Sequence, residues 1–435
     1  MTIFTLKQSL LIAMKEISLF NIAQSLLAVL VSSQPAFALS YTFTKIGAAT
    51  SQFPFVGAWD LNDAGIVAFQ RTKSFPNNDF TELYIGNGIT ALDTLIVKTG
   101  DTVANQTLGF LGYADINNNN VVSFRGLPVT GGDAIFIGDG ITTTPIFLGG
   151  TGGLGNTTIN NGNKVAFIDQ SVSTFYIGNP LTAVASVGLI YNGFGSFLGI
   201  NDSDTVAFLS LLNSGASEIR SSSPPYTTTN TIASGTGTVY HGQLAPINNN
   251  GYVLYAEGNA AGITLYVGDG ISSPLFIADN AGITNSSTTG YIGFSWYDLN
   301  DFNNVVFQAF RPGVLGGGSG IYFGPNSVSD KLIEKGDFLL GKQVFDVTLG
   351  GINNSCQVSF TAVFLDGNSL YTEAYRADPT FRCGKTAIPE PSSAIALLAL
   401  GALGTASAFK TAASRKRLIA LFASLSRSCQ SSGGC

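Results

Sequence analysis

Charged residues are scarce in this sequence: Asp, Glu, Lys and Arg make up 11 % of its 435 positions, against about 25 % in an average soluble domain. Histidine is almost absent, since His241 is the single one, and it lies in a Gly/Thr-rich stretch typical of a solvated loop. This argues against a histidine-based zinc site or catalytic base. There is no Cys-x-x-Cys pair, and no P-loop, nucleophile elbow or dinucleotide fingerprint stands in the right structural context, because the Gly-x-Gly pieces belong to hairpin turns. The sequence therefore predicts no catalytic residue and no bound organic cofactor.

The repeat region of the chain also contains no cluster of basic residues. The formal net charge is −6 and the isoelectric point is near 4.8. Nucleic acid is recognised by basic patches, so it is not an expected partner. Apolar residues make up 45 % of the chain, which is enough to form a core and argues against disorder.

What the sequence has instead is a nine-residue phrase that occurs seven times, first as Leu61 to Phe69 (LNDAGIVAF). Each copy runs from an apolar residue through Asn, Asp and Gly to a β-branched and aromatic end. A recurrence every 40 to 50 residues or so is typical of propeller blades and solenoid coils. The second residue of every copy is an asparagine, and these are Asn62, Asn117, Asn160, Asn201, Asn248, Asn300 and Asn353.

Each copy predicts a tight turn followed by a buried strand, because Asn and Asp bond their own backbone in turns and Val-Ala-Phe is β-prone. Further along, Asn87-Gly88, Asp139-Gly140 and Asp269-Gly270 predict hairpins in which both central residues have φ > 0. Three to four antiparallel strands per unit favour an all-β, seven-bladed β-propeller over residues 39–386. An open β-repeat solenoid is the alternative.

The first strand after the amino-terminal segment bears on closure of the ring. Tyr41 to Gly47 (YTFTKIG) is similar to the third-strand stretch Leu95 to Gly100 (LIVKTG), and the seventh unit has few residues left for strands of its own. We therefore expect the amino-terminal strand to complete the last blade, which removes the exposed sheet edges.

Residues 1–38 have the features of an export signal. An apolar run from Ser25 to Ser32 ends near Ala36-Phe37-Ala38, an A-x-A cleavage signature, so we expect a signal peptide cleaved after Ala38. The segment is long for a signal peptide, and a start at Met14 gives a more usual length. An uncleaved amino-terminal anchor is the alternative.

The carboxyl-terminal part has the features of a second targeting signal, at residues 387–417. Its apolar stretch, residues 394–409, is just short of the roughly 20 residues that span a bilayer, and a basic cluster follows it. The marker residues are Pro389, Glu390, Pro391, Arg415, Lys416 and Arg417. This order closely resembles the PEP-CTERM sorting signal of exported Gram-negative and cyanobacterial proteins. The tail at 418–435 extends beyond the point where such signals end.

The repeats are similar to the tandem NxxGxVAF family of exported bacterial proteins, whose formula Leu61 to Phe69 matches in full. Together the two resemblances imply an exosortase-type partner and an inner-membrane intermediate held by residues 394–409. They also imply a final place at the cell surface or outside the cell, in contact with exopolysaccharide. The repeat family implies no established biochemical activity.

Acidic residues gather around the repeat turns. Asx turns that bond their own backbone are the default interpretation, and calcium binding through their oxygens is the alternative. Paired carboxylates for glycoside hydrolysis are a third, because seven blades bring such turns together around one axis. The candidate calcium ligands are Asp60, Asp63, Asp115, Asp202, Asp204, Asp298 and Asp301.

Four other residues invite structural or binding roles. Cys356 and Cys383 are predicted to form a disulfide in an oxidising compartment, with two buried thiols as the alternative. Trp59 and Trp296 precede the Asn phrase in their units, which favours packing between blades over a sugar-stacking platform. The overall prediction is an exported, non-catalytic surface or matrix protein that acts as an interaction or polysaccharide-associated module. The alternative is a secreted carbohydrate-active enzyme on a propeller scaffold.

Overall fold

The computed structural model describes residues 40–383 apart from gaps at 74–79, 90–92, 151–152, 170–173, 180–181, 187–197, 212–216, 235–244, 260–261, 281–289, 312–318 and 382. The predicted signal peptide with Ala36 and Ala38 lies outside the described residues, as do Met14, His241, the sorting segment at 387–417 and the 418–435 tail. Within the described part there is no helix with the length and hydropathy of a membrane span.

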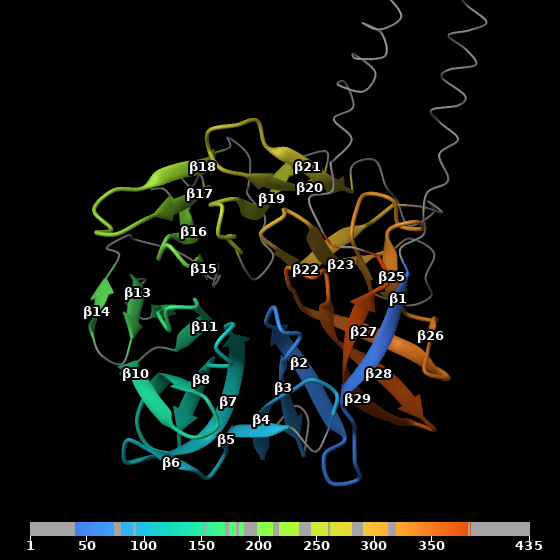
Figure 1. The fold of residues 1–435 in the computed structure, drawn as a ribbon, viewed down its shortest axis with the longest axis horizontal. Helices are drawn as coiled ribbons and strands as arrows, with labels where there is room; N and C mark the ends of the chain where they lie inside the picture. Colours follow the sequence, from blue (N-terminus) through green and yellow to red (C-terminus); the bar gives the residue numbers. More distant parts are fainter. Residues whose placement is uncertain are drawn as a thin grey trace, which may run out of the picture. The chain divides into compact units, whose positions relative to one another are not determined.

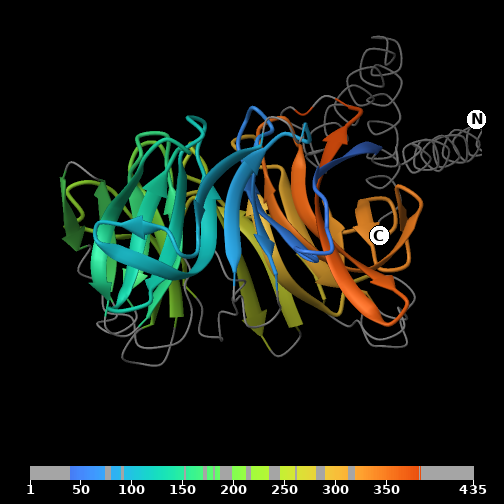
Figure 2. The ribbon, with the colours of Figure 1, turned by 90° about the horizontal axis from the view of Figure 1, so that it is seen from below.

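The described residues form seven antiparallel sheets arranged around one axis (Figure 1). Figure 2 shows the blades edge-on, with their strands running between the two faces of the ring. The prediction of a seven-bladed β-propeller is confirmed, and the open solenoid is wrong. In each blade the innermost strand directly precedes the repeat turn, because that turn joins the first strand to the second.

Blades 1 to 4 follow one another along the chain, and the strands of each blade run in order from the innermost outward. Blade 1 contains β2 (Phe55–Leu61), β3 (Val67–Thr72), β4 (Thr81–Gly86) and β5 (Thr94–Lys98). Blade 2 contains β7 (Gln106–Ile116), β8 (Val122–Pro128), β9 (Asp133–Gly138) and β10 (Thr143–Gly150), with the short β6 (Thr102–Val103) beside β7. Blade 3 contains β11 (Leu154–Ile159), β12 (Val165–Asp169), β13 (Thr174–Asn179) and β14 (Thr182–Ser186). Blade 4 contains β15 (Leu198–Ile200), β16 (Val206–Leu211), β17 (Ser217–Ser222) and β18 (Asn230–Ser234).

Blades 5 to 7 complete the ring. Blade 5 contains β19 (Val253–Asn259), β20 (Gly262–Gly268) and β21 (Leu275–Asp279), and its innermost position is an isolated bridge between Ile247 and Val253. Blade 6 contains β22 (Gly293–Leu299), β23 (Val305–Phe310), β24 (Ser319–Tyr322) and β25 (Lys331–Glu334). Blade 7 contains β27 (Lys342–Ile352), β28 (Val358–Asp366), β29 (Ser369–Pro379) and β1 (Tyr41–Gly47), with β26 (Phe338–Leu339) beside β27.

Blade 7 joins the two ends of the described chain. Its outermost strand is β1, which pairs antiparallel with β29 from Tyr41 opposite Pro379 to Gly47 opposite Ala374. The amino-terminal strand therefore completes the last blade, as its sequence predicted. A disulfide joins Cys356, in the repeat turn of this blade, to Cys383, with 5.4 Å between their Cα atoms.

The core repeats with the blades. The aromatic residue that ends each repeat phrase lies on the second strand and is buried, and in six blades it contacts an aromatic ring directly across on the third strand. Such cross-strand aromatic pairs stabilise a sheet beyond the area they bury. The six pairs are Phe69–Tyr84, Phe124–Phe136, Phe167–Tyr176, Tyr255–Tyr266, Phe307–Tyr322 and Phe360–Tyr375.

The seven repeat asparagines form a closed ring of hydrogen bonds, which we call the Asn ring. In blade 1 the Asn62 Oδ1 atom accepts the N–H groups of Ala64 and Ile66, both at 3.1 Å, which fixes its own turn. The Asn62 Nδ2 atom donates to the carbonyl oxygen of Asn117 in the next blade at 3.1 Å. The same bond recurs around the ring at 2.9 to 3.1 Å, and Asn353 donates to the carbonyl of Asn62 to close it.

Removing one member of this ring tests its contribution to stability. Asn201→Ala deletes the acceptor for Ser203 and Thr205 N–H and the donor to Asn248 O in a buried place. We expect it to lower the free energy of unfolding by roughly 2 to 4 kcal/mol, because buried backbone groups lose their partners. Thermal unfolding measures the effect. Ser203→Ala, in the exposed part of the same turn, is the control, and equal losses in both variants would contradict the prediction.

Candidate functional site

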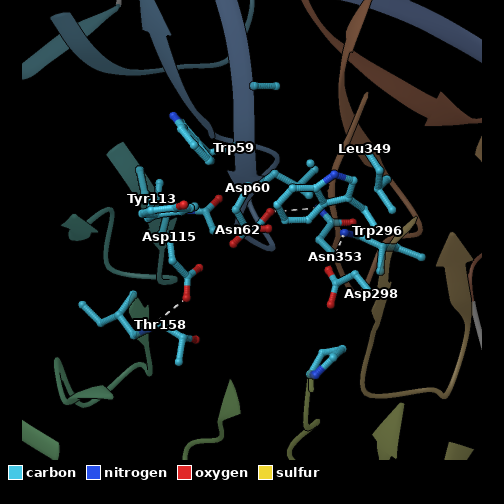
Figure 3. Close-up of a pocket in the computed structure, with 18 of the residues that line it drawn as sticks. Trp59, Asp60, Asn62, Tyr113, Asp115, Thr158, Trp296, Asp298, Leu349 and Asn353 are labelled. Atoms are coloured by element: carbon cyan, nitrogen blue, oxygen red, sulfur yellow. Dashed lines mark hydrogen bonds between the residues drawn. The ribbon is translucent and has the colours of Figure 1, made fainter. Parts of the chain in front are cut away.

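A cavity of about 750 Å³ occupies the centre of the propeller, and it is lined mainly by the innermost strands. Figure 3 shows part of its wall, with aromatic rings and carboxyl groups from different blades facing the same space. A volume of this size falls in the range of about 300 to 1,000 Å³ in which proteins bind small molecules. The cavity is therefore the candidate site.

Three aromatic side chains on the wall come from irregular positions in the innermost strands. Register shifts interrupt the pairing of β2 beside Trp59, of β7 around Tyr113 and of β22 around Trp296. Bulges of this kind re-aim a side chain, and all three residues line the cavity. The expected packing role also holds in part, because Trp59 and Trp296 contact core residues of the blades.

Tyr113 is held in a backbone conformation that bulky residues rarely adopt. Its φ angle is +51°, in the left-handed region, which costs a non-glycine residue on the order of 1 to 3 kcal/mol and is concentrated at functional sites. Its ring centroid lies 6.0 Å from that of Trp59, and the Arg125 guanidinium lies 5.9 Å from its centroid. The Trp59 indole N–H donates to Gln70 Oε1 at 3.2 Å, which fixes that ring as well.

Among the acidic residues that line the same cavity, three stand two residues before a repeat asparagine. Asp115 Oδ2 accepts the N–H of Ile159 in the next blade at 2.8 Å. Asp298 Oδ2 accepts the N–H of Ile352 in the next blade at 2.9 Å, and its Oδ1 accepts the N–H of Leu299 at 2.8 Å. Two of the three carboxyl groups thus connect neighbouring blades.

The third carboxyl group, Asp60, lies beside the other two. At its position in blade 7 the chain has Gly351, and a Cβ atom there would collide with the Asp60 carboxyl oxygen and approach Asp298 Oδ2. Burial raises the pKa of Asp60 well above its usual value, and the neighbouring Asp115 carboxyl raises that pKa further by repulsion and by a hydrogen bond. Burial also raises the pKa of Asp298, to about 7, against the opposing effect of the N–H groups it accepts.

A second ring of hydrogen bonds, which we call the Asx ring, lies next to the Asn ring and is more exposed. The residue after each repeat asparagine donates its N–H to the side-chain oxygen of its counterpart in the next blade, at 2.8 to 2.9 Å throughout. In order around the axis the members are Asp63, Asn118, Asn161, Asp202, Asn249, Asp301 and Asn354. No two aspartates are neighbours in this order, so every carboxylate is flanked by two asparagines and repulsion between like charges is kept low.

The candidate calcium ligands therefore separate into three places. Asp63, Asp202 and Asp301 belong to the Asx ring, and Asp60, Asp115 and Asp298 stand two residues before a repeat asparagine; all six line the cavity. Asp204 accepts a hydrogen bond from Asn160 Nδ2 at 2.9 Å and forms an ion pair with Lys164. In the described part of the chain no three His, Cys, Asp or Glu side chains come together in a way that could hold a metal ion.

Sequence reasoning missed one feature of the site and misjudged another. Tyr113 was not singled out, although it stands four residues before Asn117 as Trp296 stands four before Asn300. The predicted hairpins form, but their turns differ: Gly88 has φ +95°, whereas Asn87 does not have a positive φ. The asparagine side chain instead accepts the N–H of Ile89 at 3.1 Å.

The raised carboxyl pKa values make stability depend on pH. Folded Asp60 and Asp298 keep their protons at pH values where the unfolded chain has lost them. These groups therefore favour folding at low pH, and stability falls as pH rises from 3.8 toward about 7. We expect Asp60→Asn to flatten this fall and to raise the melting temperature at neutral pH by a few degrees. Thermal unfolding across this range measures it. Asp366→Asn, on an exposed hairpin, is the control and should keep the wild-type slope.

Chelation tests the calcium alternative. Asp301 Oδ1 accepts the Asn249 N–H, and its Oδ2 accepts the Nδ2 groups of Asn249 and Asn354. Asp63 has equivalent partners, so these carboxylates have partners without a cation. We expect EDTA to leave the melting temperature unchanged. A fall that added Ca²⁺ restores would instead assign the Asx ring carboxylates to a calcium site.

No protein-family model and no curated protein matches this chain. Several solved structures are similar to it in fold. The β-propeller domain of the trilobed protease from Pyrococcus furiosus is 11 % identical, with 76 % of this chain and 99 % of that chain covered at a TM-score of 0.47. Catalytically inactive virginiamycin B lyase from Staphylococcus aureus, with quinupristin, is 9 % identical over 78 % and 99 % at 0.43. YCF48 bound to D1 peptide is 11 % identical over 78 % and 98 % at 0.42. At such identities the likeness concerns the propeller fold alone.

Proposed function

We propose that this protein is an exported, non-catalytic surface or matrix component that binds a neutral, hydroxyl-rich ligand, such as a segment of exopolysaccharide, in its central cavity. The observation that carries the proposal is the convergence of aromatic rings and carboxyl groups from different blades on one space. Trp59, Tyr113 and Trp296 supply the rings, and Asp60 and Asp298 are among the carboxyl groups.

The chemistry of these groups suits a sugar. Indole and phenol rings offer wide apolar faces with a polar edge, against which the C–H face of a sugar ring packs. A protonated carboxyl group both donates and accepts hydrogen bonds, as a hydroxyl-rich ligand requires. The acidic groups of the Asx ring, Asp63, Asp202 and Asp301, also line the cavity, and their negative charge disfavours an anionic ligand. The proposal is therefore limited to neutral sugars.

The predicted targeting signals near the two ends of the sequence support the proposed location outside the cell or at its surface. The A-x-A signature at Ala36 to Ala38, the Pro389-Glu390-Pro391 motif and the apolar stretch 394–409 with its basic cluster are those of an exported protein sorted by an exosortase-type enzyme. Disulfides persist in oxidising compartments, so the bridge between Cys356 and Cys383 is in keeping with export.

A glycan-active enzyme is the second candidate, and the carboxyl cluster is what favours it. A carboxyl group with a raised pKa beside a second carboxyl group is the arrangement that glycosidases use. Against this, Asp115 and Asp298 already accept backbone N–H groups of the following blade. Those bonds give both residues a structural task, and for that reason we place binding first.

Titration calorimetry with neutral hexose oligosaccharides tests the binding site, with uronic acid oligosaccharides as the comparison. We expect Trp296→Ala and Tyr113→Ala each to weaken binding of the neutral sugars by about tenfold, from the loss of one aromatic contact. Phe338→Ala, exposed and outside the cavity, is the control and should bind as the wild type does. Unchanged binding in both cavity variants would contradict the proposed site.

The same mixtures separate the two candidates. A binding protein leaves the oligosaccharides intact during long incubation. New reducing ends that appear with the wild type and disappear with Asp60→Asn would support the enzyme and overturn the non-catalytic proposal.

A further inference from the structure

Four outer turns of the propeller each present one exposed aliphatic side chain at the same place. Each turn joins the third and fourth strands of its blade, in blades 1, 2, 5 and 6. A single exposed aliphatic residue is ordinary on a protein surface, whereas these four recur at one structural position. The four residues and their exposed fractions are Ile89 at 56 %, Ile141 at 91 %, Ile271 at 92 % and Val328 at 63 %.

The same local bond holds all four in place. In each turn the side-chain oxygen of an Asn or Asp two residues earlier accepts the N–H of the aliphatic residue. The four bonds are Ile89 N to Asn87 Oδ1 at 3.1 Å, Ile141 N to Asp139 Oδ1 at 2.8 Å, Ile271 N to Asp269 Oδ1 at 2.9 Å and Val328 N to Asn326 Oδ1 at 2.9 Å. An Asx turn of this kind fixes the backbone of the tip, and the aliphatic side chain is therefore held in its exposed position.

All four tips lie on one face of the propeller. In blade 1, Leu61 pairs with Val67, Val67 with Gly86, and Ile85 with Thr94. The repeat turn and the outer turn therefore lie at the same end of the sheet, and the other blades follow the same order. We call this end the ring face, since it carries the Asn and Asx rings, and the opposite end the far face.

Both ends of the described chain are also at the ring face. Tyr41 pairs with Pro379 at the end of blade 7 where its repeat turn lies. Thr380 donates its N–H and its hydroxyl to Ser40 O, at 2.9 and 3.0 Å, which ties the two ends together. Cys383 is bonded to Cys356 in that repeat turn. The apolar stretch 394–409 begins eleven residues after Cys383, and fully extended these cover at most about 40 Å.

We propose that the ring face docks on the surface of a lipid bilayer, with the four aliphatic tips entering the boundary between headgroups and acyl chains. This rests on the proposed membrane attachment through residues 394–409, which places a bilayer within reach of the face that the chain leaves. The tips are distributed around the rim instead of lining one groove. A flat and extended partner therefore matches them better than a peptide does.

Charge on this face selects the kind of bilayer. Backbone N–H groups, of Thr142 and Ser272 first, lower the pKa of Asp139 and Asp269, so both tips carry negative charge. The Asx ring adds Asp63, Asp202 and Asp301. Anionic headgroups repel such a face, so a zwitterionic surface is the expected partner.

The test uses the full chain reconstituted in phosphatidylcholine vesicles. The substitutions Cys429→Ser and Cys435→Ser leave the introduced cysteine as the single free thiol beside the disulfide. A bimane label is placed at Ile141→Cys or Ile271→Cys on the ring face. The control is Val129→Cys, which is also exposed on blade 2 but follows the far-face end of β8. Nitroxide groups on the lipid acyl chains then report contact.

We expect the fluorescence of labels at 141 and 271 to be lost with nitroxide lipid and the fluorescence of the label at 129 to be retained. If the protein floats with the vesicles but the label at 141 keeps its fluorescence, docking is overturned while membrane attachment stays in place. Failure to float would overturn both. With a pyrene label in place of bimane at Ile141→Cys, excimer emission without quenching by nitroxide lipid would assign the ring face to contact between two copies and overturn docking on the bilayer.

Discussion

The amide group of one asparagine per blade is the constraint on which the rest of the structure depends. Asn carries an acceptor and a donor on one short side chain. It can therefore fix its own turn with the oxygen and reach the next blade with the nitrogen, as Asn160 does toward Lys164 N and Asn201 O. Asp lacks the donor, and a serine hydroxyl is too short for both tasks. Seven such residues, each no more than 5 % exposed, close the ring from within.

Closure of the ring by these bonds determines which side chains line the cavity. The residues immediately before each ring asparagine are held around the axis, and their side chains line a common space. Glycine at 351 leaves the space that the Asp60 and Asp298 carboxyl groups occupy. Gathering acidic groups there lowers stability at neutral pH. Packing alone does not account for an acidic cluster that lowers stability, whereas a binding site for a polar ligand does.

The two faces of the propeller are chemically different. The ring face carries the Asx ring, the aliphatic turn tips and both ends of the described chain. The far face carries Phe345 and Leu370, which are exposed and line the mouth of the cavity at that end. Docking through the ring face, where the Asx ring lines the cavity, would leave this mouth at the far face open to solvent.

The sequence by itself determined the number of blades, the position of each repeat turn and the completion of the last blade by β1, because turn chemistry and strand periodicity are local. It also pointed to Asp60, Asp115 and Asp298 without separating them from Asp63, Asp202 and Asp301. Only the tertiary structure decided that separation, since neighbours in either ring are 41 to 291 residues apart in the chain. Tyr113 reaches the cavity through a strand irregularity, and the pKa values of the carboxyl groups follow from burial and proximity, which arise only when seven blades meet.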